Sequence, residues 1–585
     1  MRFGHFIRCL VGSLWLLPVG AQEVNSTFFN PVLPGWHSDP SCIRVEDTFF
    51  CTASTFIAFP GLPVYASKDL VNWRLISHAW NRDSQLPGMS WNTTLQQDGM
   101  WAPTMRYHEG EFFLICEYIL NGATLEDLGE GSVGVLFRSK DPFNDSAWSD
   151  PLLFYPNKID PDIFWDDDGT VYVSTQGIVM QKLDLVTGEL SHPPVLLWNG
   201  TGGEWPEGPH LYRRDGWYYL LIAEGGTGLN HSVTIARSKD IEGPYESNPS
   251  NPILTNRGTD EYFQRIGHGD LFDDINGNWW AIVHGSRCGP LWISNPMGRE
   301  SVLAPARWDQ GEWPVIDKVQ GRLETWPLPE ATRDDIPGDG PFNGDPDILD
   351  FDASSHMPKH FVYWRVPRED SFRFTDEGLE IVPSRSNLTG SVGDDDLALT
   401  GQRGLSFVAR RQTHTIFDFS VDVSLSGTDE GQEAGLSVFI AQDNHVDISL
   451  LYLKPCSSEA PGLHVRFHAQ GKGSPPQAMM ALPPDWIEAD SIRLHIKATE
   501  PETFVLGASL EDGAMVELGS APSELVSNVD SATAGTFVGV LVGAFATCNG
   551  AGEGDDCPEG GVGRFQRWRY TPLAQYIDYD EVIEA

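Results

Sequence analysis

Positive charge is scarce in this chain. Lys and Arg together number 39 against 82 Asp and Glu, which gives a formal net charge of −43. Nucleic acids and anionic membranes repel such a surface, so we expect neither as a partner. Long apolar runs are also missing, since the longest one, close to the start of the chain, is too short to span a bilayer. We therefore expect no membrane span.

Cysteine is rare as well, with 8 in 585 residues. Cys42 and Cys51 lie symmetrically about a predicted turn, so they could face each other across a hairpin. Cys548 and Cys557 bracket a Gly/Asp-rich loop and are the stronger candidates for a disulfide. Neither spacing is that of a zinc site.

The beginning of the chain has the pattern of a secretory signal peptide over residues 1–21. Arg2 and Arg8 precede a short apolar run, and Val19-Gly20-Ala21 follows it. An N-terminal membrane anchor is the alternative interpretation. Sequons for N-glycosylation occur at Asn25, Asn92, Asn144, Asn199, Asn230 and Asn387. We expect a secreted, extracellular glycoprotein.

Five stretches of the first half share one plan: a polar or aromatic lead residue, a short strand, a tight turn of acidic and glycine residues, and an aromatic strand. The lead residues recur roughly every fifty to sixty positions, a spacing in the range of propeller blades. They are Asp39, Trp101, Asp160, Glu207 and His268. Helical periodicity is hard to find before about residue 330. The pattern predicts a five-bladed β-propeller.

The composition changes after the repeats. Residues 334–341 are rich in Asp, Gly and Pro, as is typical of a linker. Beyond them, segments such as 415–423 and 434–440 alternate or run apolar as strands do. We expect an all-β chain with a propeller over 28–330, a linker over 331–347 and a β-sandwich over 348–575.

Three of the five lead residues are carboxylates. The lead residues of inner propeller strands converge on one end of the axis, so Asp39, Asp160 and Glu207 should face one pocket. Inverting cleavage of a glycosidic bond needs one carboxylic acid and one carboxylate on opposite faces of the sugar. The alternative is structural, with each carboxylate capping a strand or pairing with an arginine such as Arg287. His268 could order water, help to hold a cation or be an ordinary core histidine.

Several motifs resemble glycoside hydrolase family 43. They run in order over about residues 28–325, and the second half resembles the concanavalin-like C-terminal domain of the β-xylosidase branch. The motifs are Asn30-Pro31-Val32-Leu33-Pro34-Gly35, Ser38-Asp39-Pro40-Ser41, Ser54-Thr55-Phe56, Trp101-Ala102-Pro103, Ile159-Asp160-Pro161, Glu207-Gly208-Pro209-His210 and Met297-Gly298-Arg299-Glu300. The resemblance implies inverting, exo-type release of L-arabinofuranose or D-xylose from a polysaccharide or oligosaccharide.

Carried over by position, the resemblance makes Asp39 the general base and Glu207 the general acid, with Asp160 orienting the acid and raising its pKa. Phe56, Trp101, Ala102, Arg287 and His268 would bind the sugar. The family's usual aromatic-His-Pro-Asp-Pro is here Trp36-His37-Ser38-Asp39, which bears on substrate preference. No cofactor is expected to be required, and a structural calcium ion would sit near His268.

Release of α-L-arabinofuranosyl side chains is our first expectation, and β-xylosidase action on xylo-oligosaccharides is the second. A fructan or sucrose hydrolase shares the propeller layout but opens with Asn-Asp-Pro-Asn, where this chain has serines around Asp39-Pro40. A non-catalytic sugar-binding protein is the alternative from another class. The sandwich could contribute a loop to the pocket rim, bind polysaccharide or only stabilise the propeller.

Overall fold

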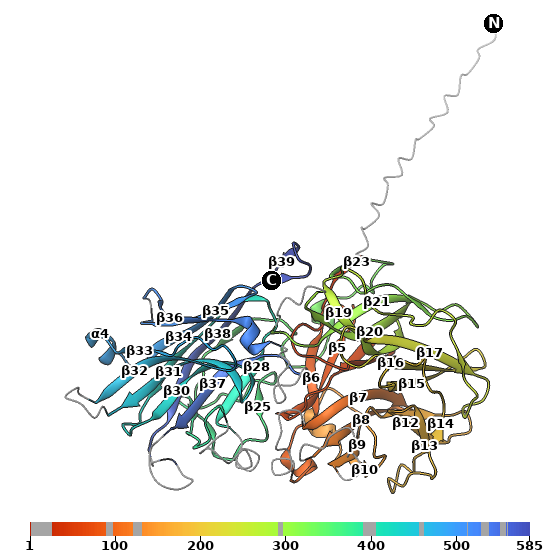
Figure 1. Ribbon diagram of the computed structural model, residues 1–585, viewed down its shortest axis with the longest axis horizontal. Helices are drawn as coiled ribbons and strands as arrows, with labels where there is room; N and C mark the ends of the chain where they lie inside the picture. Colours follow the sequence, from red (N-terminus) through yellow and green to blue (C-terminus); the bar gives the residue numbers. More distant parts are fainter. Residues whose placement is uncertain are drawn as a thin grey trace.

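The structure is a computed structural model. It describes Met1 and residues 26–88, 98–120, 131–289, 296–389, 405–454, 461–511, 513–527, 537–549, 557 and 560–585. The predicted signal peptide and the sequons at Asn25 and Asn92 lie outside these ranges. None of the helices in these ranges is long and apolar enough to cross a membrane. Figure 1 shows two β-rich bodies side by side, with the first half of the chain in one and the second half in the other.

The first body is a propeller of five four-stranded sheets within the described residues. The first strand of each sheet contacts the first strands of its two neighbours, in the ring β2, β7, β11, β15 and β19. The sheets are β2 (Ser41–Val45), β3 (Thr48–Thr52), β5 (Gly61–Ser67) and β6 (Arg74–Trp80); β7 (Gly99–His108), β8 (Glu111–Ile119), β9 (Ser132–Ser139) and β10 (Leu152–Phe154); β11 (Asp162–Trp165), β12 (Val171–Thr175), β13 (Val179–Lys182) and β14 (Val195–Leu196); β15 (Glu207–Arg214), β16 (Trp217–Glu224), β17 (Ser232–Ser238) and β18 (Glu246–Ser247); and β19 (Phe263–Asp273), β20 (Trp279–Arg287), β21 (Glu300–Arg307) and β22 (Val315–Ile316). β1 (Thr27–Phe29) pairs with β23 (Arg322–Glu324) beside this ring.

The turns predicted from acidic-glycine pairs join the first two strands of blades. Glu109 and Gly110 have φ of 48° and 86°, and Asp215 and Gly216 have φ of 50° and 74°. Two successive left-handed residues are what a two-residue hairpin of type I′ requires. These turns hold strand pairs β7–β8 and β15–β16 in register.

The second body is a β-sandwich of one nine-stranded and one eight-stranded sheet in the described residues. Alternate residues of its strands fill one large apolar core. The nine-stranded sheet contains β24 (Asp347–Leu349), β26 (Phe372–Thr375), β27 (Gly378–Ile381), β29 (Ile416–Leu425), β34 (Ile492–Glu500), β35 (Thr503–Ser509), β36 (Val516–Pro522), β38 (Gly563–Tyr576) and β39 (Val582–Glu584). The eight-stranded sheet runs in the order β33 (Ala478–Ala481), β32 (Gly462–Gln470), β31 (Asn444–Leu453), β30 (Gln432–Ala441), β37 (Leu541–Cys548), β28 (Phe407–Arg411), β25 (Val362–Trp364) and β4 (Ala58–Phe59). The other elements that the structure describes are one short α-helix, α4 (Pro484–Ile487), and the 3₁₀ turns η1 (Asp83–Gln85), η2 (Asp145–Ala147), η3 (Arg333–Asp335) and η4 (Ser523–Val526).

The sheets therefore bear out the prediction of an all-β chain with a five-bladed propeller and a concanavalin-like sandwich. Two details differ from the expected ranges. β24 begins at Asp347, inside the predicted linker, and β39 extends the sandwich beyond residue 575. Both strands pair with the long strand β38, whose unpaired edge groups they satisfy.

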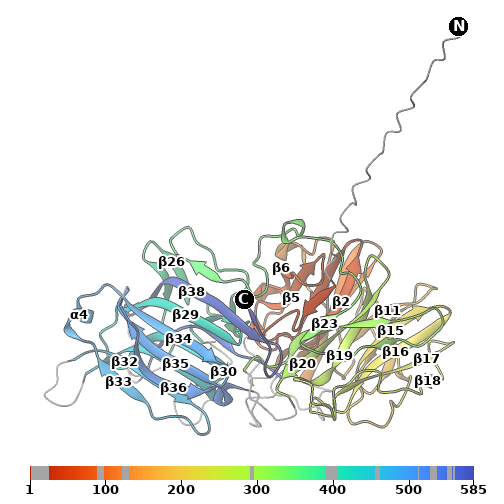
Figure 2. The same cartoon turned by 90° about the horizontal axis from the view of Figure 1, so that it is seen from above.

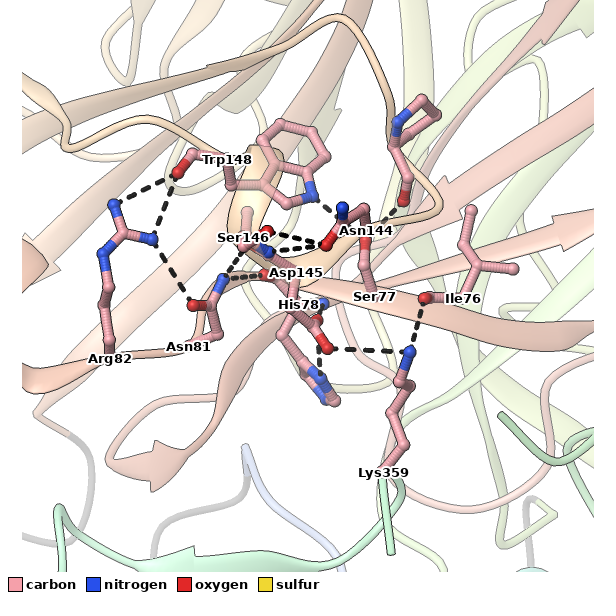
Figure 3. A network of polar contacts seen from close by, with 12 residues as sticks. Ile76, Ser77, His78, Asn81, Arg82, Asn144, Asp145, Ser146, Trp148 and Lys359 are labelled. Carbon is pink, nitrogen blue, oxygen red and sulfur yellow. Dashed lines mark hydrogen bonds and ion pairs between the residues drawn. The ribbon is translucent and has the colours of Figure 1, made fainter. Parts of the chain in front are cut away.

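The two bodies are joined by shared strands and polar contacts. β4 comes from the propeller half of the sequence yet pairs with β25 of the sandwich sheet. Figure 3 shows a second junction, where Lys359 donates to the carbonyl of Ile76 at 3.0 Å and lies 3.6 Å from Asp145. Asp145 in turn accepts from the backbone N–H of His78 at 2.7 Å. The first two blades and the sandwich are thus tied through one carboxylate. Figure 2 shows the same two bodies in contact from above.

The structure contains both disulfides that the sequence suggested. Cys42 pairs with Cys51 across the hairpin of β2 and β3, and Cys548 pairs with Cys557. Cys116 and Cys288 are free and buried. Both expected pairs form, including the one that the sequence favoured less.

Candidate active site

A pocket of about 400 Å³ opens where the inner propeller strands begin. All three carboxylates predicted from the repeats line it, together with His268 and the predicted sugar-binding residues Phe56, Trp101 and Ala102. The rest of the lining is Ile159, Glu204, Trp205, residues 225–230, Arg299 and Phe537. A larger cavity of about 670 Å³ lies on the sandwich, but Asp422 there already pairs with Arg493 and Arg567.

The lead positions of the blades share an unusual backbone conformation. One residue in or just before each inner strand has a positive φ, which costs energy for any residue but glycine and is concentrated at functional sites. The five are Asp39 (52°), Ala102 (44°), Asp160 (58°), Gly208 (55°) and His268 (42°). Glu207 and Trp101 therefore precede the equivalent position by one residue. The register shifts recorded beside them, in β15 and β7, are β-bulges, and a bulge redirects a side chain.

Asp39 is held by cations and donors on every side. Arg299 reaches its two carboxylate oxygens at 2.8 and 3.2 Å, His284 Nδ1 lies 3.0 Å away, and Ser54 Oγ donates to it at 2.7 Å. Burial alone would raise the pKa of Asp39, but Arg299, followed by His284 and His268, outweighs it and holds the pKa well below its usual value. The lowered pKa favours the ionised form of Asp39.

Asp160 and Glu207 are perturbed in the opposite direction. Burial, followed by the charge of Asp39, raises the pKa of Asp160 to about 6 against the pull of His268. Burial also raises the pKa of Glu207 well above its usual value, and the charges of Asp160 and Asp39 add to this. The backbone N–H of Gly208 donates to Asp160 at 3.1 Å, which ties Asp160 to the chain segment that carries Glu207. Glu207 is therefore suited to hold a proton near neutral pH.

His268 stands between the carboxylates. Its Nδ1 lies 3.8 Å from Asp39 and 4.0 Å from Asp160. Burial lowers its pKa despite both charges, which favours the neutral imidazole. Asp160, Glu207 and His268 each offer a ligand atom within 4.8 Å of the others, so this group could hold a cation.

Aromatic side chains from both bodies form one wall of the pocket. The ring of Phe537, from the sandwich, stacks on Phe56 at 6.2 Å and meets the edge of Trp101 at 5.7 Å. Arg299 lies over the same ring at 4.9 Å. Apolar ring faces of this kind suit the C–H face of a sugar. Of the roles considered for the sandwich, the contribution to the pocket rim is the one this contact supports.

Arg287, predicted to bind the sugar, does not line the pocket. It is fully buried, pairs with Glu300 through two contacts of 2.6 and 2.7 Å, and donates to Gln575 and to the carbonyl of Tyr576 in the sandwich. This prediction was wrong, because Glu300 on the neighbouring strand captures the guanidinium. Arg299 supplies the positive charge in the pocket instead. It lies in the quoted Met297-Gly298-Arg299-Glu300 motif, which was the signal that could have identified it.

The propeller axis beneath the pocket is filled by a polar network that the sequence did not reveal. Arg106 lies 3.0 Å from Asp162 and 2.6 Å from Asp270, and 2.9 Å from His210. Ser41 also donates to Asp270, at 2.7 Å. Each of the five inner strands contributes one of these residues, so the network links the blades whose first residues build the pocket.

The chemistry that the pocket can perform follows from the opposite pKa shifts of Asp39 and Glu207. An ionised carboxylate and a carboxyl group that keeps its proton face one sugar-sized hollow. Together they can protonate a leaving oxygen and activate a water molecule, the two requirements of acid–base hydrolysis of a glycoside.

The proteins to which this chain is similar are also glycoside hydrolases. Residues 28–314 match the model of glycosyl hydrolases family 43, and residues 349–557 match the β-xylosidase C-terminal concanavalin A-like domain. A non-reducing end α-L-arabinofuranosidase of Bacteroides ovatus is 34% identical over 92% of this chain and 94% of its own. A xylosidase/arabinosidase of Butyrivibrio fibrisolvens is 32% identical over 73% of this chain and 80% of its own. The crystal structure of BlXynB from Bacillus licheniformis superposes with a TM-score of 0.78 at 27% identity, covering 94% of this chain and 100% of that one.

Proposed function

Because the chain belongs to family 43 of the glycosyl hydrolases and is a glycoside hydrolase of the arabinofuranosidase and xylosidase type, we propose that it releases terminal α-L-arabinofuranosyl side chains from arabinoxylan, with inversion. The observation that carries the proposal is the convergence of Asp39, Asp160 and Glu207 on one pocket with opposite pKa shifts. The most similar full-length relative quoted above is an arabinofuranosidase, which supports the choice of sugar.

In this proposal Glu207 is the general acid and Asp39 the general base. Glu207 donates its proton to the glycosidic oxygen as the bond to the anomeric carbon breaks. Asp39 takes a proton from the water molecule that attacks the opposite face. Asp160 keeps Glu207 protonated by like-charge proximity and positions it through Gly208.

The pocket wall supports an exo mode of action. Phe537 and Arg299 line the pocket next to Asp39, and Phe56 and Trp101 contact Phe537 in the same wall. A hollow of about 400 Å³ accommodates one terminal sugar and part of the next. Substrate chains would therefore enter by their non-reducing ends.

A β-D-xylosidase acting on xylo-oligosaccharides is the second candidate. It is favoured by the family of the C-terminal domain and by relatives that carry both activities in their names. Chromogenic α-L-arabinofuranoside and β-D-xyloside assayed side by side separate the two. We expect a higher kcat/KM on the arabinofuranoside, and turnover of the xyloside alone would reverse the order.

The product profile on arabinoxylan, followed by NMR from the first turnover, tests inversion, linkage and sugar together. We expect free arabinose to appear first as the β-anomer. The α-anomer appearing first would mean retention and a different use of the carboxylates. Sugar binding without any product would favour the non-catalytic alternative.

We further propose that hydrolysis needs no cofactor. A cation bound by Asp160, Glu207 and His268 would require an ionised Glu207, which is incompatible with its role as an acid. Any calcium ion near His268 would then be structural, and dialysis against EDTA should leave turnover unchanged.

We also propose that the protein is exported. The signal-peptide pattern and the two disulfides support this, because disulfides persist in oxidising compartments.

A further inference from the structure

A second group of histidine and carboxylate side chains lies far from the pocket, on the outer face of the eight-stranded sandwich sheet. His445 and Asp447 are two apart on β31 and so point to the same face. His468 on the neighbouring strand β32 is paired in register with Asp447. Residues between them, such as Val446 and Ile448, point the other way into the core.

The three side chains have the separations of metal ligands. Asp447 Oδ2 lies 2.8 Å from His445 Nδ1 and 3.3 Å from His468 Nδ1, and each of the three residues offers a ligand atom within 4.8 Å of those of the other two. Ligand atoms held at about 2.0–2.1 Å around one tetrahedral Zn²⁺ lie roughly 3.3 Å apart. Two imidazoles and one carboxylate on one side of an ion are a recurrent set for divalent transition metals.

The surroundings orient the carboxylate for this use. Ser437 Oγ on β30 donates to Asp447 Oδ1 at 2.6 Å, which leaves Oδ2 facing both histidines. Such a donor behind a ligating carboxylate is typical of metal sites. The adjacent Glu433 is paired with Arg466 at 2.5 Å, so this guanidinium is already matched by another carboxylate.

Asp447 is a buried anion that needs a positive charge. Its side chain is 3% exposed, and the basic side chains that contact it in the described residues are the two histidines. The Nε2 atom of His445 is buried and has no hydrogen-bond partner in the described part of the chain.

There is also room for further ligands. A cavity of about 340 Å³ is lined by all three side chains together with Arg466, Thr547 and Asn549. The side chain of His468 is 25% exposed and gives a path from solvent. Water or an exogenous donor could complete the coordination of an ion from this cavity.

We propose that His445, Asp447 and His468 bind one divalent transition-metal ion of the Zn²⁺ class. The two nitrogen ligands select against Ca²⁺ and Mg²⁺, which take oxygen ligands. The site lies on the sandwich and is separate from the group formed by Asp160, Glu207 and His268. The three ligands lie on the adjacent strands β31 and β32, and Ser437, which donates to Asp447, lies on the next strand, β30.

The test is a titration of the full chain with Co²⁺, monitored by the visible absorption of the bound ion. Zn²⁺ is then added as a competitor. The wild type should show a d–d spectrum that Zn²⁺ abolishes. His468→Gln should either lose one equivalent of bound Co²⁺ or bind it with at least about tenfold lower affinity. Replacing a residue that only supports a ligand already changes metal affinity about 10–100-fold, and His468 is a proposed ligand. His464→Gln is the matched control, because His464 lies on the same face of β32, and its Nδ1 is 3.1 Å from the carbonyl of Gly462.

The proposal is overturned if wild type, His468→Gln and His464→Gln bind the same amount of Co²⁺ with equal affinity, or if the wild type gives no Co²⁺ spectrum. The absence of a wild-type Co²⁺ spectrum overturns the proposal even if the variant folds poorly. The proposal is supported if His468→Gln loses one equivalent of Co²⁺ and His464→Gln does not. Any Co²⁺ that His468→Gln still binds would then be held at Asp160, Glu207 and His268.

Discussion

The propeller and the sandwich each contain a compact group of histidine and carboxylate side chains, and the described residues hold two such groups. They are assembled in different ways. In the propeller, Asp160, Glu207 and His268 come from three blades, separated by dozens of residues. In the sandwich, His445, Asp447 and His468 come from two strands paired in register.

The difference in charge matters more than the difference in construction. The propeller pocket crowds three acids, so burial and like charge keep one of them protonated while Arg299 keeps another ionised. The sandwich group has one acid between two imidazoles, and the neighbouring Glu433 carboxylate is paired with Arg466. The first arrangement prepares proton transfer. The second prepares the binding of a positive ion.

The largest effect should come from removing the proposed proton donor of the propeller group, Glu207. Glu207→Gln keeps the shape of the side chain but cannot deliver a proton, so kcat on arabinofuranosides with poor leaving groups should fall about 10²–10⁴-fold. Circular dichroism should report an unchanged fold. His464→Gln in the sandwich serves as the control and should retain wild-type turnover. Undiminished kcat in Glu207→Gln would mean that the acid is another residue.

The next effect links the two bodies. Phe537→Ala removes the sandwich ring that stacks on Phe56 and lies beneath Arg299, so KM should rise about fivefold, in line with about 1 kcal/mol for an aromatic contact beyond its buried area. Steady-state kinetics on the chromogenic substrate measure it. Phe374→Ala, which removes a ring packed on Phe351 inside the sandwich, is the control for general destabilisation. Equal KM values in Phe537→Ala and wild type would show that the sandwich does not contribute to binding.

The smallest effect is a displacement of the pH profile. In the proposed mechanism Glu207 must be protonated, so activity is lost as the pH rises through its raised pKa. Asp160→Asn removes a negative charge that raises that pKa, so the alkaline limb of kcat/KM should move to lower pH. The acidic limb depends on Asp39, whose pKa is already low, and should not move upward. A profile measured from about pH 3 to 9 with an unmoved alkaline limb would contradict the coupling of Asp160 to Glu207.

Much of the propeller could be predicted from the sequence, because its blades repeat. The acidic-glycine turns at Glu109-Gly110 and Asp215-Gly216 take the backbone conformation that those residues favour, and the lead carboxylates do converge. The repeat did not reveal that Glu207 precedes its equivalent position by one residue. A β-bulge leaves no mark in the spacing of the motifs.

The choice between two arginines shows where such reasoning stops. Arg287 and Arg299 flank the same strand pair, and both are suited by type to bind hydroxyl groups. Only the packing of Glu300 against Arg287 decides that Arg299 faces the pocket. Phe537 could not be predicted either, because its neighbours Phe56 and Trp101 are more than four hundred residues away in the chain.

The sequence by itself determined the strands, the turns, the two-body organisation and the identity of the three acids, because these depend on local patterns that repeat or match a family. The tertiary structure alone decided which charges neighbour each acid, and therefore which one keeps its proton. It also decided that a sandwich ring completes the propeller pocket and that two histidines meet Asp447. Burial and electrostatic fields act through space, and no local pattern encodes the distances on which they depend.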